Sequence, residues 1–375
     1  MRIAVLSNTA WSLVNFRAGL INRLIADGNH IVAIAPIDEY SSQLEALGVE
    51  YQSIKIDNKG KNPVRDLGLI FNLAGVLHRK KIDLAILYTI KPVIYGSLAC
   101  SILKIPVINV ITGLGTAFLS DGVLTRVVES LYRIALKRVY WTFFLNDDDR
   151  SLFLARGLVQ ENMSSRIPGE GVNLINFSPR SQTTEKHGTH FLFAGRMLRD
   201  KGLVEFVEAA RSVGARYPTT RFSLLGFVGV ANQSAIGIDQ LNAWVQEGVV
   251  CYLGSTNDVR SHVASADCFV LPSYREGISR ALLEAMAMAR PVIATDVVGC
   301  RELVDQGGNG LLCAPRDVKS LIDAMEKFIK MDEHSRTEMG LHGLAKVTRE
   351  YGEAVVIEKY LEKISALQSA REKDW

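Results

Sequence analysis

The chain is 375 residues long, and 48% of its residues are hydrophobic and 22% charged, which is typical of a folded globular protein and excludes an intrinsically disordered one. One hydrophobic core rarely serves a chain of this length, so we expect two domains of nearly equal size. The net charge of +3 is uneven: residues 1–180 carry 20 Lys and Arg against 15 Asp and Glu, and the remainder carries 23 against 25. The basic first half favours a phosphate-bearing partner, either a small ligand or an anionic lipid surface, and we expect no nucleic-acid partner.

The cysteines and the apolar segments indicate the cellular compartment in which we expect the protein. Five cysteines show no CxxC pair and no spacing of a metal site or disulfide framework, so we expect reduced packing residues. The apolar run at the amino terminus is too short for a signal peptide and fits a buried strand. Residues 84–110 are interrupted by lysines and prolines, without the roughly 18 apolar residues that a membrane-spanning helix needs. We therefore expect a cytoplasmic protein that does not cross the membrane.

The first half alternates short apolar runs with amphipathic stretches. The predicted strands are residues 3–6, 30–35, 84–88, 107–110 and 142–145. Strands that alternate with helices indicate βαβ units and a parallel sheet.

Residues 124–140 are predicted to form an amphipathic helix. Arg126, Arg133 and Lys137 fall on one stripe, and apolar residues at 124, 128, 131 and 135 oppose it. Two interpretations stay open, and both can hold: the apolar side packs in the domain core, or the helix lies on a membrane. We expect the basic stripe to contact anionic lipid at the inner face of the plasma membrane.

The acidic run 147–149 follows the strand predicted at 142–145. It resembles a metal-binding acidic motif, but capping and the helix dipole explain three aspartates at the start of a helix. No histidine shows metal-ligand spacing, and the pair Gly113 and Gly115 lacks the third glycine of a dinucleotide fingerprint. We expect neither a metal nor an organic cofactor.

The second half repeats the alternation of strands and helices. The predicted strands are residues 190–194, 221–225, 249–253, 268–271 and 291–294, and clear helical patterns lie at 203–217 and 318–330. Between the halves, residues 168–184 are rich in Pro, Gly, Asn and Ser and lack a period. We predict an α/β protein of two doubly wound, Rossmann-like domains facing across a cleft. Their bounds are 1–172 and 185–350, with a linker at 173–184 and a last helix at 351–375 that crosses back to the first domain.

Cations follow the strand predicted at 190–194. Gly195 lets the backbone approach a ligand, and Arg196 and Lys201 come next at the carboxyl end of that strand. In parallel sheets, ligands bind beyond the carboxyl ends of the strands. Arginine forks and lysine point charges both bind phosphate oxygens, so this segment predicts a diphosphate site.

Two glutamates follow the strand predicted at 268–271. Glu276 lies on the loop, and Glu284 lies about a turn into a helix that Ser279 is placed to cap. The first amides of that helix, at residues 280–282, are predicted to form an anion site. Cations and amides for a diphosphate, with carboxylates for hydroxyls, are the groups that a sugar nucleotide requires.

The segment from Glu276 to Glu284 resembles the E-x7-E motif of the family-4 glycosyltransferases of the GT-B fold. The likeness covers almost the whole chain, including the segments 171–173, 177–179, 195–201, 299–304 and 310–312. It implies that Glu276 binds hydroxyls of the donor sugar and Glu284 the ribose diol, while Arg196 and Lys201 bind the diphosphate. The backbone contacts that it implies come from Gly277, Ile278, Ser279, Arg280, Ala281 and Leu282.

Within that family, the chain is most similar to bacterial transferases that extend undecaprenyl-diphosphate-linked glycans, particularly N-acetylgalactosaminyltransferases acting on lipid-linked bacillosamine. The likeness rests on segments 6–8, 15–17, 111–118 and 130–132, and it departs at Thr112, where the relatives tend to have a carboxylate. The residues that it places toward the acceptor are Ser7, Asn8, Asn15, Arg17, Thr112 and Gly113.

The resemblance implies a retaining, metal-independent transfer of an N-acetylhexosamine in surface polysaccharide or glycan assembly. The donor is a UDP-sugar, with N-acetylgalactosamine favoured over N-acetylglucosamine, and the acceptor is a polyprenyl-diphosphate-linked saccharide. The enzyme is then peripheral at the inner face of the plasma membrane. Two alternatives stay open: a UDP-sugar 2-epimerase, and a catalytically silent partner that binds nucleotide sugars.

Overall fold

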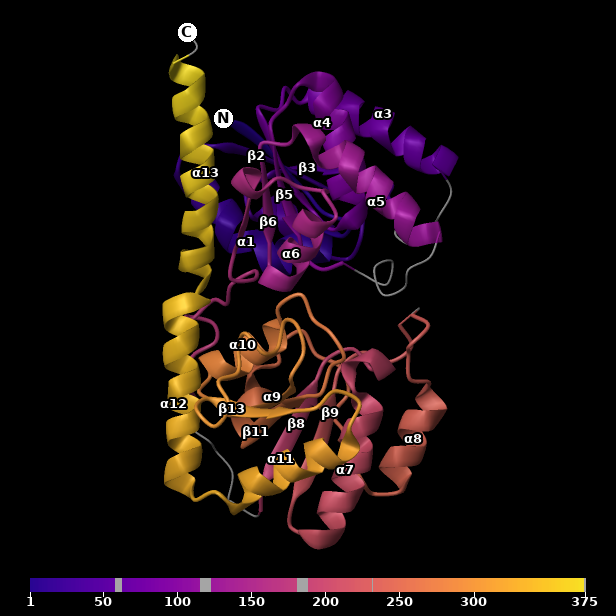
Figure 1. Ribbon diagram of the computed structural model, residues 1–375, viewed down its shortest axis with the longest axis vertical. Coiled ribbons are helices and arrows are strands. Elements are labelled where there is room, and N and C mark those ends of the chain that lie inside the picture. The colour runs from indigo at the N-terminus through magenta and orange to yellow at the C-terminus, as the bar shows by residue number, and fades with distance from the viewer. Residues whose placement is uncertain (58–62, 115–122, 181–187, 231, 374–375) are drawn as a thin grey trace. The chain divides into compact units, whose positions relative to one another are not determined.

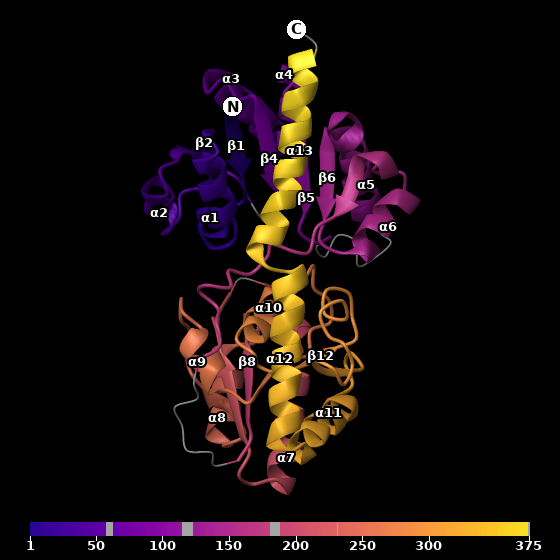
Figure 2. The same ribbon diagram turned by 90° about the vertical axis from the view of Figure 1, so that its left-hand side faces the viewer.

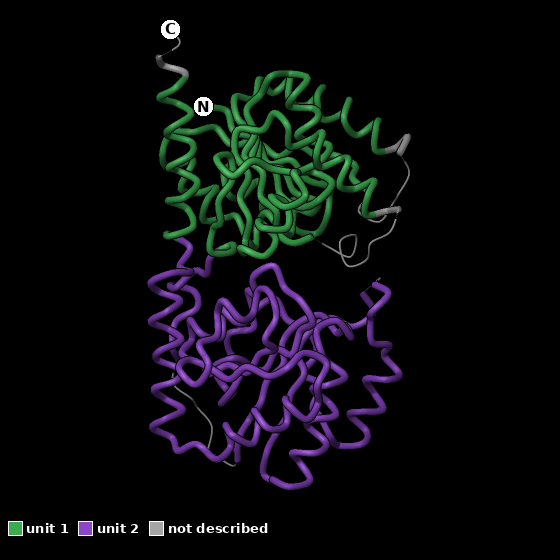
Figure 3. The backbone as a smooth tube through the Cα atoms, viewed as in Figure 1, with its two compact units in different colours: residues 1–170, 354–375 green, residues 171–353 purple. Residues whose placement is uncertain are grey.

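The computed structural model describes residues 1–57, 63–114, 123–180, 188–230 and 232–373. It divides into two compact units (Figures 1 and 3). Unit 1 comprises Met1–Glu170 and Ala354–Trp375, and unit 2 comprises Gly171–Glu353. The chain therefore passes from unit 1 to unit 2 and returns for its last helix.

Unit 1 is built on a parallel sheet. In its described part the strands are β1 (Arg2–Leu6), β2 (His30–Ala35), β3 (Glu50–Ser53), β4 (Leu84–Tyr88), β5 (Val107–Ile111), β6 (Trp141–Phe144) and β7 (Ser164–Arg166), in the order β3-β2-β1-β4-β5-β6-β7. The predicted strands are confirmed to within one residue at each end. The polar strands β3 and β7 were not predicted, because Glu50–Ser53 and Ser164–Arg166 lack the apolar residues of a buried strand.

Helices cover both faces of this sheet. They are α1 (Ala10–Ala26), α2 (Ser41–Ala46), α3 (Pro63–Arg79), α4 (Ser97–Leu103), α5 (Val123–Ala135), α6 (Asp147–Ala155) and α13 (Glu353–Lys373), with short turns η1 (Pro92–Gly96), η3 (Leu136–Arg138) and η4 (Glu161–Met163).

Phe143 and Phe144 are successive residues of β6, so their side chains point to opposite faces of the sheet. Phe144 joins the core formed with α3, α4, α5 and α6. The Phe143 ring lies 5.1 Å from the ring of Tyr360 in α13, the helix that runs along unit 1 in Figure 2. Helix α1 lies beside α13, because Arg23 Nη1 is 3.1 Å from Glu358 Oε1.

Unit 2 is a second parallel α/β layer structure. Its described strands are β8 (His190–Ala194), β9 (Arg221–Leu225), β10 (Cys251–Tyr252), β11 (Cys268–Leu271), β12 (Val292–Thr295) and β13 (Gly310–Cys313), in the order β10-β9-β8-β11-β12-β13. Its helices are η5 (Arg199–Lys201), α7 (Leu203–Arg216), α8 (Ile238–Gln246), α9 (Arg260–Ser265), α10 (Arg280–Ala287), α11 (Val318–Lys330) and α12 (Glu333–Glu350). Strand β13 was not predicted, and β10 is shorter than the predicted strand.

The segment predicted as a linker is part of unit 2. Val172 N donates to Tyr351 O at 3.0 Å, and Asn173 Nδ2 donates to Glu353 Oε2 at 3.0 Å. Phe177 packs against the hydrophobic core of unit 2. The described residues 173–180 therefore pack against unit 2 and do not form a free spacer. Residues 181–184 of the predicted linker lie outside the described residues.

Arg17 of α1 is a buried cation of unit 1. Its side chain is only 2% exposed and pairs with Glu170, the last residue before the chain passes to unit 2. The guanidinium carbon also lies 4.1 Å from the centroid of the Tyr88 ring. Such a pair is costly to break, because the remaining charge stays buried without its partner.

Replacing Glu170 with Gln leaves the Arg17 charge uncompensated. We expect Glu170→Gln to lower the free energy of unfolding by about 3 kcal/mol, measured by urea denaturation and circular dichroism. Glu358→Gln is the matched control, because it breaks the exposed Arg23–Glu358 pair and should change stability by less than about 0.5 kcal/mol. Equal effects of the two variants would contradict the structural role of the buried pair.

Candidate active site

The strand order of unit 2 reverses between β8 and β11, and ligands of open parallel sheets bind at the carboxyl ends of the strands at such a point. Strand β8 ends at Ala194 and β11 at Leu271. The two segments predicted to bind a sugar nucleotide, 195–202 and 272–284, start from these strand ends. The topology therefore brings both predicted segments to one edge of the sheet.

The two loops are fastened to each other through their backbones. Gly202 has a φ of 71° and lies so close to the carbonyl oxygen of Pro272 that no Cβ atom could be placed there. Tyr274 N donates to Asp200 O at 2.9 Å. The positions of Lys201 and Glu276, which flank these contacts, are therefore fixed by backbone geometry.

Lys201 and Glu276 form an ion pair. Lys201 Nζ donates to Glu276 Oε1, and the same oxygen accepts from Ser273 Oγ at 2.7 Å. The Lys201 and Glu276 side chains are 20% and 13% exposed, so the pair is partly shielded from water. Gly299 supports the glutamate, because its φ of 81° lets it lie against the Glu276 carbonyl. Arg196 is exposed beyond β8.

Helix α10 begins where the sequence predicts it. Ser279 is its N-cap, and Ser279 Oγ accepts from Leu282 N at 3.4 Å, which confirms the predicted cap. This bond also corrects the predicted anion site: the Leu282 amide is occupied by the cap, so the site has fewer than three amides. Ile278 and Ala281 are half-buried against the core of unit 2, and Gly277 is half-buried beside them.

Glu284 is a shielded carboxylate one turn into α10. Its side chain is 17% exposed, and its Oε1 accepts from Arg280 Nε at 2.8 Å. Burial raises the pKa of Glu284, while the charge of Arg280 and its hydrogen bond act in the opposite direction. A carboxylate withdrawn from water in this way is suited to accept hydrogen bonds from a bound ligand.

The predicted acceptor residues divide into two groups in unit 1. Ser7 and Asn8 follow β1, and Thr112 and Gly113 follow β5, all at the carboxyl edge of the sheet. Ser7 is fully buried, and its hydroxyl has no hydrogen-bond partner among the described residues. The strand order of unit 1 reverses between β1 and β4, so Ser7 lies at the switch point.

The other two predicted acceptor residues lie on α1. Asn15 is exposed, and its amide donates to Trp11 O at 2.9 Å. Arg17 is buried and paired with Glu170, so the predicted contact between Arg17 and an acceptor is corrected to a structural role. An Arg in the middle of a helix looks the same in sequence whether it faces solvent or a buried glutamate. Residues 115–118 of the predicted acceptor loop lie outside the described residues.

Two residues at this edge of unit 1 were missed. Thr89, directly after β4, has a φ of 69°, a strained conformation for a β-branched residue. No sequence signal reveals this strain. Trp11 is 42% exposed in the first turn of α1, and its place just after a predicted strand could have identified it.

The basic stripe predicted at 124–140 is on the surface of α5 and η3. Arg126, Arg133 and Lys137 are exposed, while Tyr132 and Ala135 are buried in the core. The structure thus confirms an amphipathic helix with its apolar side in the domain. Among the described residues, no helix is long and apolar enough to cross a membrane.

The acidic run opens α6, as predicted, and the N-cap of that helix is Asn146. Asn146 accepts from Asp149 N at 2.7 Å, and residues 147–149 form the first turn of the helix. Within the described ranges, no group of three or more His, Cys, Asp or Glu residues is arranged to hold a metal ion.

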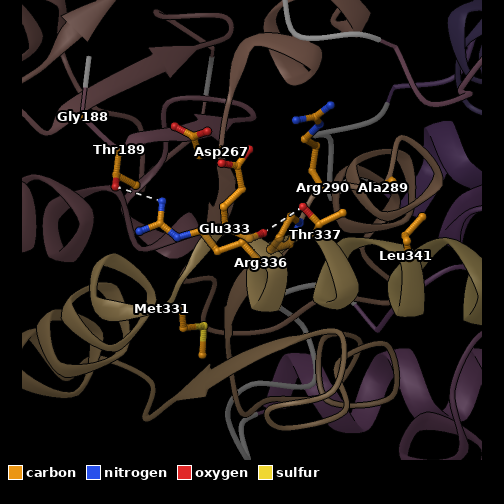
Figure 4. A pocket seen from close by; sticks show the side chains of 11 residues that line it. Gly188, Thr189, Asp267, Ala289, Arg290, Met331, Glu333, Arg336, Thr337 and Leu341 are labelled. Carbon is orange, nitrogen blue, oxygen red and sulfur yellow. Dashed lines mark hydrogen bonds between the residues drawn. The ribbon is translucent and has the colours of Figure 1, made fainter. Parts of the chain in front are cut away.

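A cavity of about 560 Å³ lies at the opposite edge of unit 2, and Figure 4 shows the side chains that line it. Thr189 precedes β8 and Asp267 precedes β11, so this cavity lies at the amino ends of the strands. Arg336 Nη1 is bonded to Thr189 Oγ1 at 3.4 Å, and Arg290 Nη1 donates to Ala266 O at 3.3 Å. None of the predicted site residues lines it.

The raised pKa of Glu284 predicts a pH-dependent stability. Between the unfolded value near 4.5 and the higher folded value, the folded state binds more protons, so wild-type stability falls as pH rises through this window. We expect Glu284→Gln to gain stability relative to wild type as pH rises from 4 to 7, measured by thermal unfolding. A difference between the two proteins that stays constant over this pH range would contradict the assigned burial effect.

Comparisons with known proteins agree with this geometry. The family description "Glycosyl transferase 4-like" matches residues 2–144, and "Glycosyl transferases group 1" matches residues 188–331. The N,N'-diacetylbacillosaminyl-diphospho-undecaprenol alpha-1,3-N-acetylgalactosaminyltransferase of Campylobacter jejuni is 29% identical over 96% of this chain and 97% of its own. The UDP-Gal:alpha-D-GlcNAc-diphosphoundecaprenol alpha-1,3-galactosyltransferase of Escherichia coli is 25% identical over 70% of each chain.

Solved structures show the same two-unit fold. HepE of Anabaena in complex with UDP has a TM-score of 0.79 at 17% identity, covering 98% of this chain and 100% of its own. Sucrose-phosphate synthase of Thermosynechococcus elongatus has a TM-score of 0.80 at 18% identity, covering 99% and 100%. The 4-like match covers most of unit 1, and the group 1 match covers most of unit 2. The chain therefore belongs to the glycosyltransferases that combine these two domains in the GT-B fold.

Proposed function

We propose that the protein transfers an N-acetylhexosamine from a UDP-sugar to a polyprenyl-diphosphate-linked saccharide in surface polysaccharide or glycan assembly, with retention of the anomeric configuration. N-acetylgalactosamine is the favoured sugar and N-acetylglucosamine the next. The observation that carries this proposal is the Lys201–Glu276 pair at the switch point of unit 2 in a chain of this family. The Campylobacter and Escherichia relatives support the acceptor class, because both are named as transferases that act on undecaprenyl-diphosphate-linked sugars.

In the proposed reaction, the bond between C1 of the sugar and the diphosphate oxygen breaks. The acceptor hydroxyl oxygen bonds to C1 on the same face, and its proton passes to a diphosphate oxygen. Negative charge grows on the departing diphosphate, and Arg196, Lys201 and the first amides of α10 stabilise that charge. The cations are side chains, so no metal ion is required.

The carboxylates have separate tasks in this mechanism. Glu276 accepts hydrogen bonds from hydroxyls of the donor sugar, and Glu284 from the ribose diol. Lys201 is paired with Glu276, so the donor diphosphate competes with a carboxylate for the lysine. At the carboxyl edge of unit 1, Ser7, Asn8 and Thr112 are proposed to contact the acceptor.

The test is an assay of products by mass. Wild type and Glu276→Gln are incubated with UDP- and GDP-sugars, with and without a short-chain lipid-linked saccharide, in the presence and absence of excess EDTA. We expect the acceptor to gain one N-acetylhexosamine from the UDP-sugar with wild type, unaffected by EDTA, and little product with Glu276→Gln.

Other products would contradict the proposal. A UDP-sugar converted without any acceptor would identify an epimerase, and nucleotide binding without turnover would identify a silent partner. Loss of activity in EDTA that Mg²⁺ or Mn²⁺ restores would overturn metal independence.

A lipid-linked acceptor requires the enzyme to reach a membrane surface, and the exposed stripe of Arg126, Arg133 and Lys137 is proposed to bind the anionic inner leaflet. Each basic residue near such a surface contributes about 1 kcal/mol, screened beyond ~8 Å at physiological salt. We expect co-sedimentation with anionic vesicles that high salt weakens and that the triple change of the stripe to Glu abolishes.

The matched control changes an exposed basic stripe on α11 of unit 2 to Glu in the same way; its residues are Lys319, Lys327 and Lys330. This control should still bind the vesicles. Equal binding by wild type and both triple variants would show that α5 does not bind the membrane. Binding that does not depend on salt or on lipid charge would contradict the electrostatic mechanism.

A further inference from the structure

Phe227 is an exposed aromatic residue. It lies at the carboxyl edge of the unit 2 sheet, the same edge that carries the candidate site. It comes two residues after the end of β9, and its side chain is 52% exposed. Among the phenylalanines of unit 2, all of which are described, six are buried and Phe177 is half-buried. The exposed ring lies at the carboxyl edge of the sheet, where ligands bind in such folds.

The backbone around Phe227 is held from several sides. Phe227 O accepts from Met197 N at 3.0 Å, and Gly226 N donates to Gly254 O at 2.8 Å. Gly226 O accepts from Tyr252 Oη at 2.8 Å. The ring is therefore presented on a fixed segment, and little conformational freedom is lost when a ligand packs on it.

The same contacts place Phe227 beside the phosphate-binding loop. Gly226 has a φ of 145° and lies against the carbonyl of Gly195, so close that a Cβ atom would collide. Met197, which is bonded to Phe227, directly follows Arg196 in the chain. A ligand whose diphosphate lies at Arg196 thus has an aromatic surface within the span of one nucleoside.

On the other side of the switch point, the loop after β11 carries Tyr274, but this residue is half-buried, its hydroxyl donates to Glu205 Oε1 at 2.6 Å and the Arg316 guanidinium lies over its ring. The residues that follow β12 are Asp296, Val297, Val298 and Gly299, and none is aromatic. Strand β9 is the neighbour of β8, and neighbouring strands lie about 4.8 Å apart. The β9 side is therefore the side on which a planar group of the ligand can stack.

We propose that Phe227 is the stacking surface for the nucleobase of the donor. This inference rests on the proposed function, because that function supplies a nucleoside diphosphate as the ligand. Every base has a π-face, so Phe227 contributes affinity and leaves the choice between uracil and other bases to polar groups. Truncation of a stacking side chain costs about 1–3 kcal/mol per base, which corresponds to a roughly 5- to 150-fold change in Kd.

The test compares two ligands that differ by the nucleoside. Isothermal titration measures the Kd of UDP and of inorganic pyrophosphate for wild type, Phe227→Ala, Phe227→Leu and Phe227→Tyr. We expect Ala and Leu to weaken UDP binding by about tenfold or more, Tyr to bind as wild type does, and pyrophosphate binding to be the same in all four proteins. Ile238→Ala is the matched control, because Ile238 is also 52% exposed and lies on α8 of unit 2; it should change neither Kd.

The outcomes separate this inference from the proposed function. Unchanged UDP binding in Phe227→Ala and Phe227→Leu would overturn the stacking role and leave the proposed function standing. Equal weakening of UDP and pyrophosphate would also overturn it, since Phe227 would then act through the shape of the Arg196 loop. Wild-type protein that binds pyrophosphate but not UDP would overturn the proposed donor itself. Thermal unfolding of each variant, with Phe227→Tyr as the folded aromatic reference, shows that altered binding is not caused by unfolding.

Discussion

The candidate site depends on one close backbone contact, that between Gly202 and the carbonyl of Pro272 in unit 2. A side chain at position 202 would force apart the loops that follow β8 and β11. With glycine there, Lys201 reaches Glu276 from the neighbouring loop, and the hydroxyl of Ser273 bonds to the same carboxylate oxygen. Under the proposed function, the groups that bind the diphosphate are thus positioned by the sheet and its turns, which is the arrangement that electrostatic catalysis requires.

Both carboxylates of the candidate site are paired with cations. Lys201 pairs with Glu276, and Arg280 with Glu284. Each pair is partly withdrawn from water, so removing either partner would leave a poorly solvated charge. Arg196 differs, because it is exposed at the end of β8. Under the proposed function, the diphosphate first binds the exposed Arg196 and then replaces Glu276 as the partner of Lys201.

Much of this architecture is predictable from the sequence, because buried parallel strands are continuous apolar runs and their carboxyl ends point to the site. The cap at Ser279 follows from its place before an apolar helix. The failures have physical causes: the edge strand β3 is polar, and the Leu282 amide is taken by its own cap. The burial of Arg17 depends on Glu170, a residue 153 positions away, and no local pattern reveals it.

In the proposed mechanism, side-chain cations stabilise the charge that develops on the departing diphosphate. Steady-state kinetics of Arg196→Ala test it most directly, because Arg196 is exposed and its removal leaves the Lys201–Glu276 pair in place. The account predicts that kcat with the UDP-sugar falls by about 10²-fold while KM changes only a few-fold, since the interaction strengthens toward the transition state. A higher KM with unchanged kcat would contradict it, because Arg196 would then bind the donor and its transition state equally.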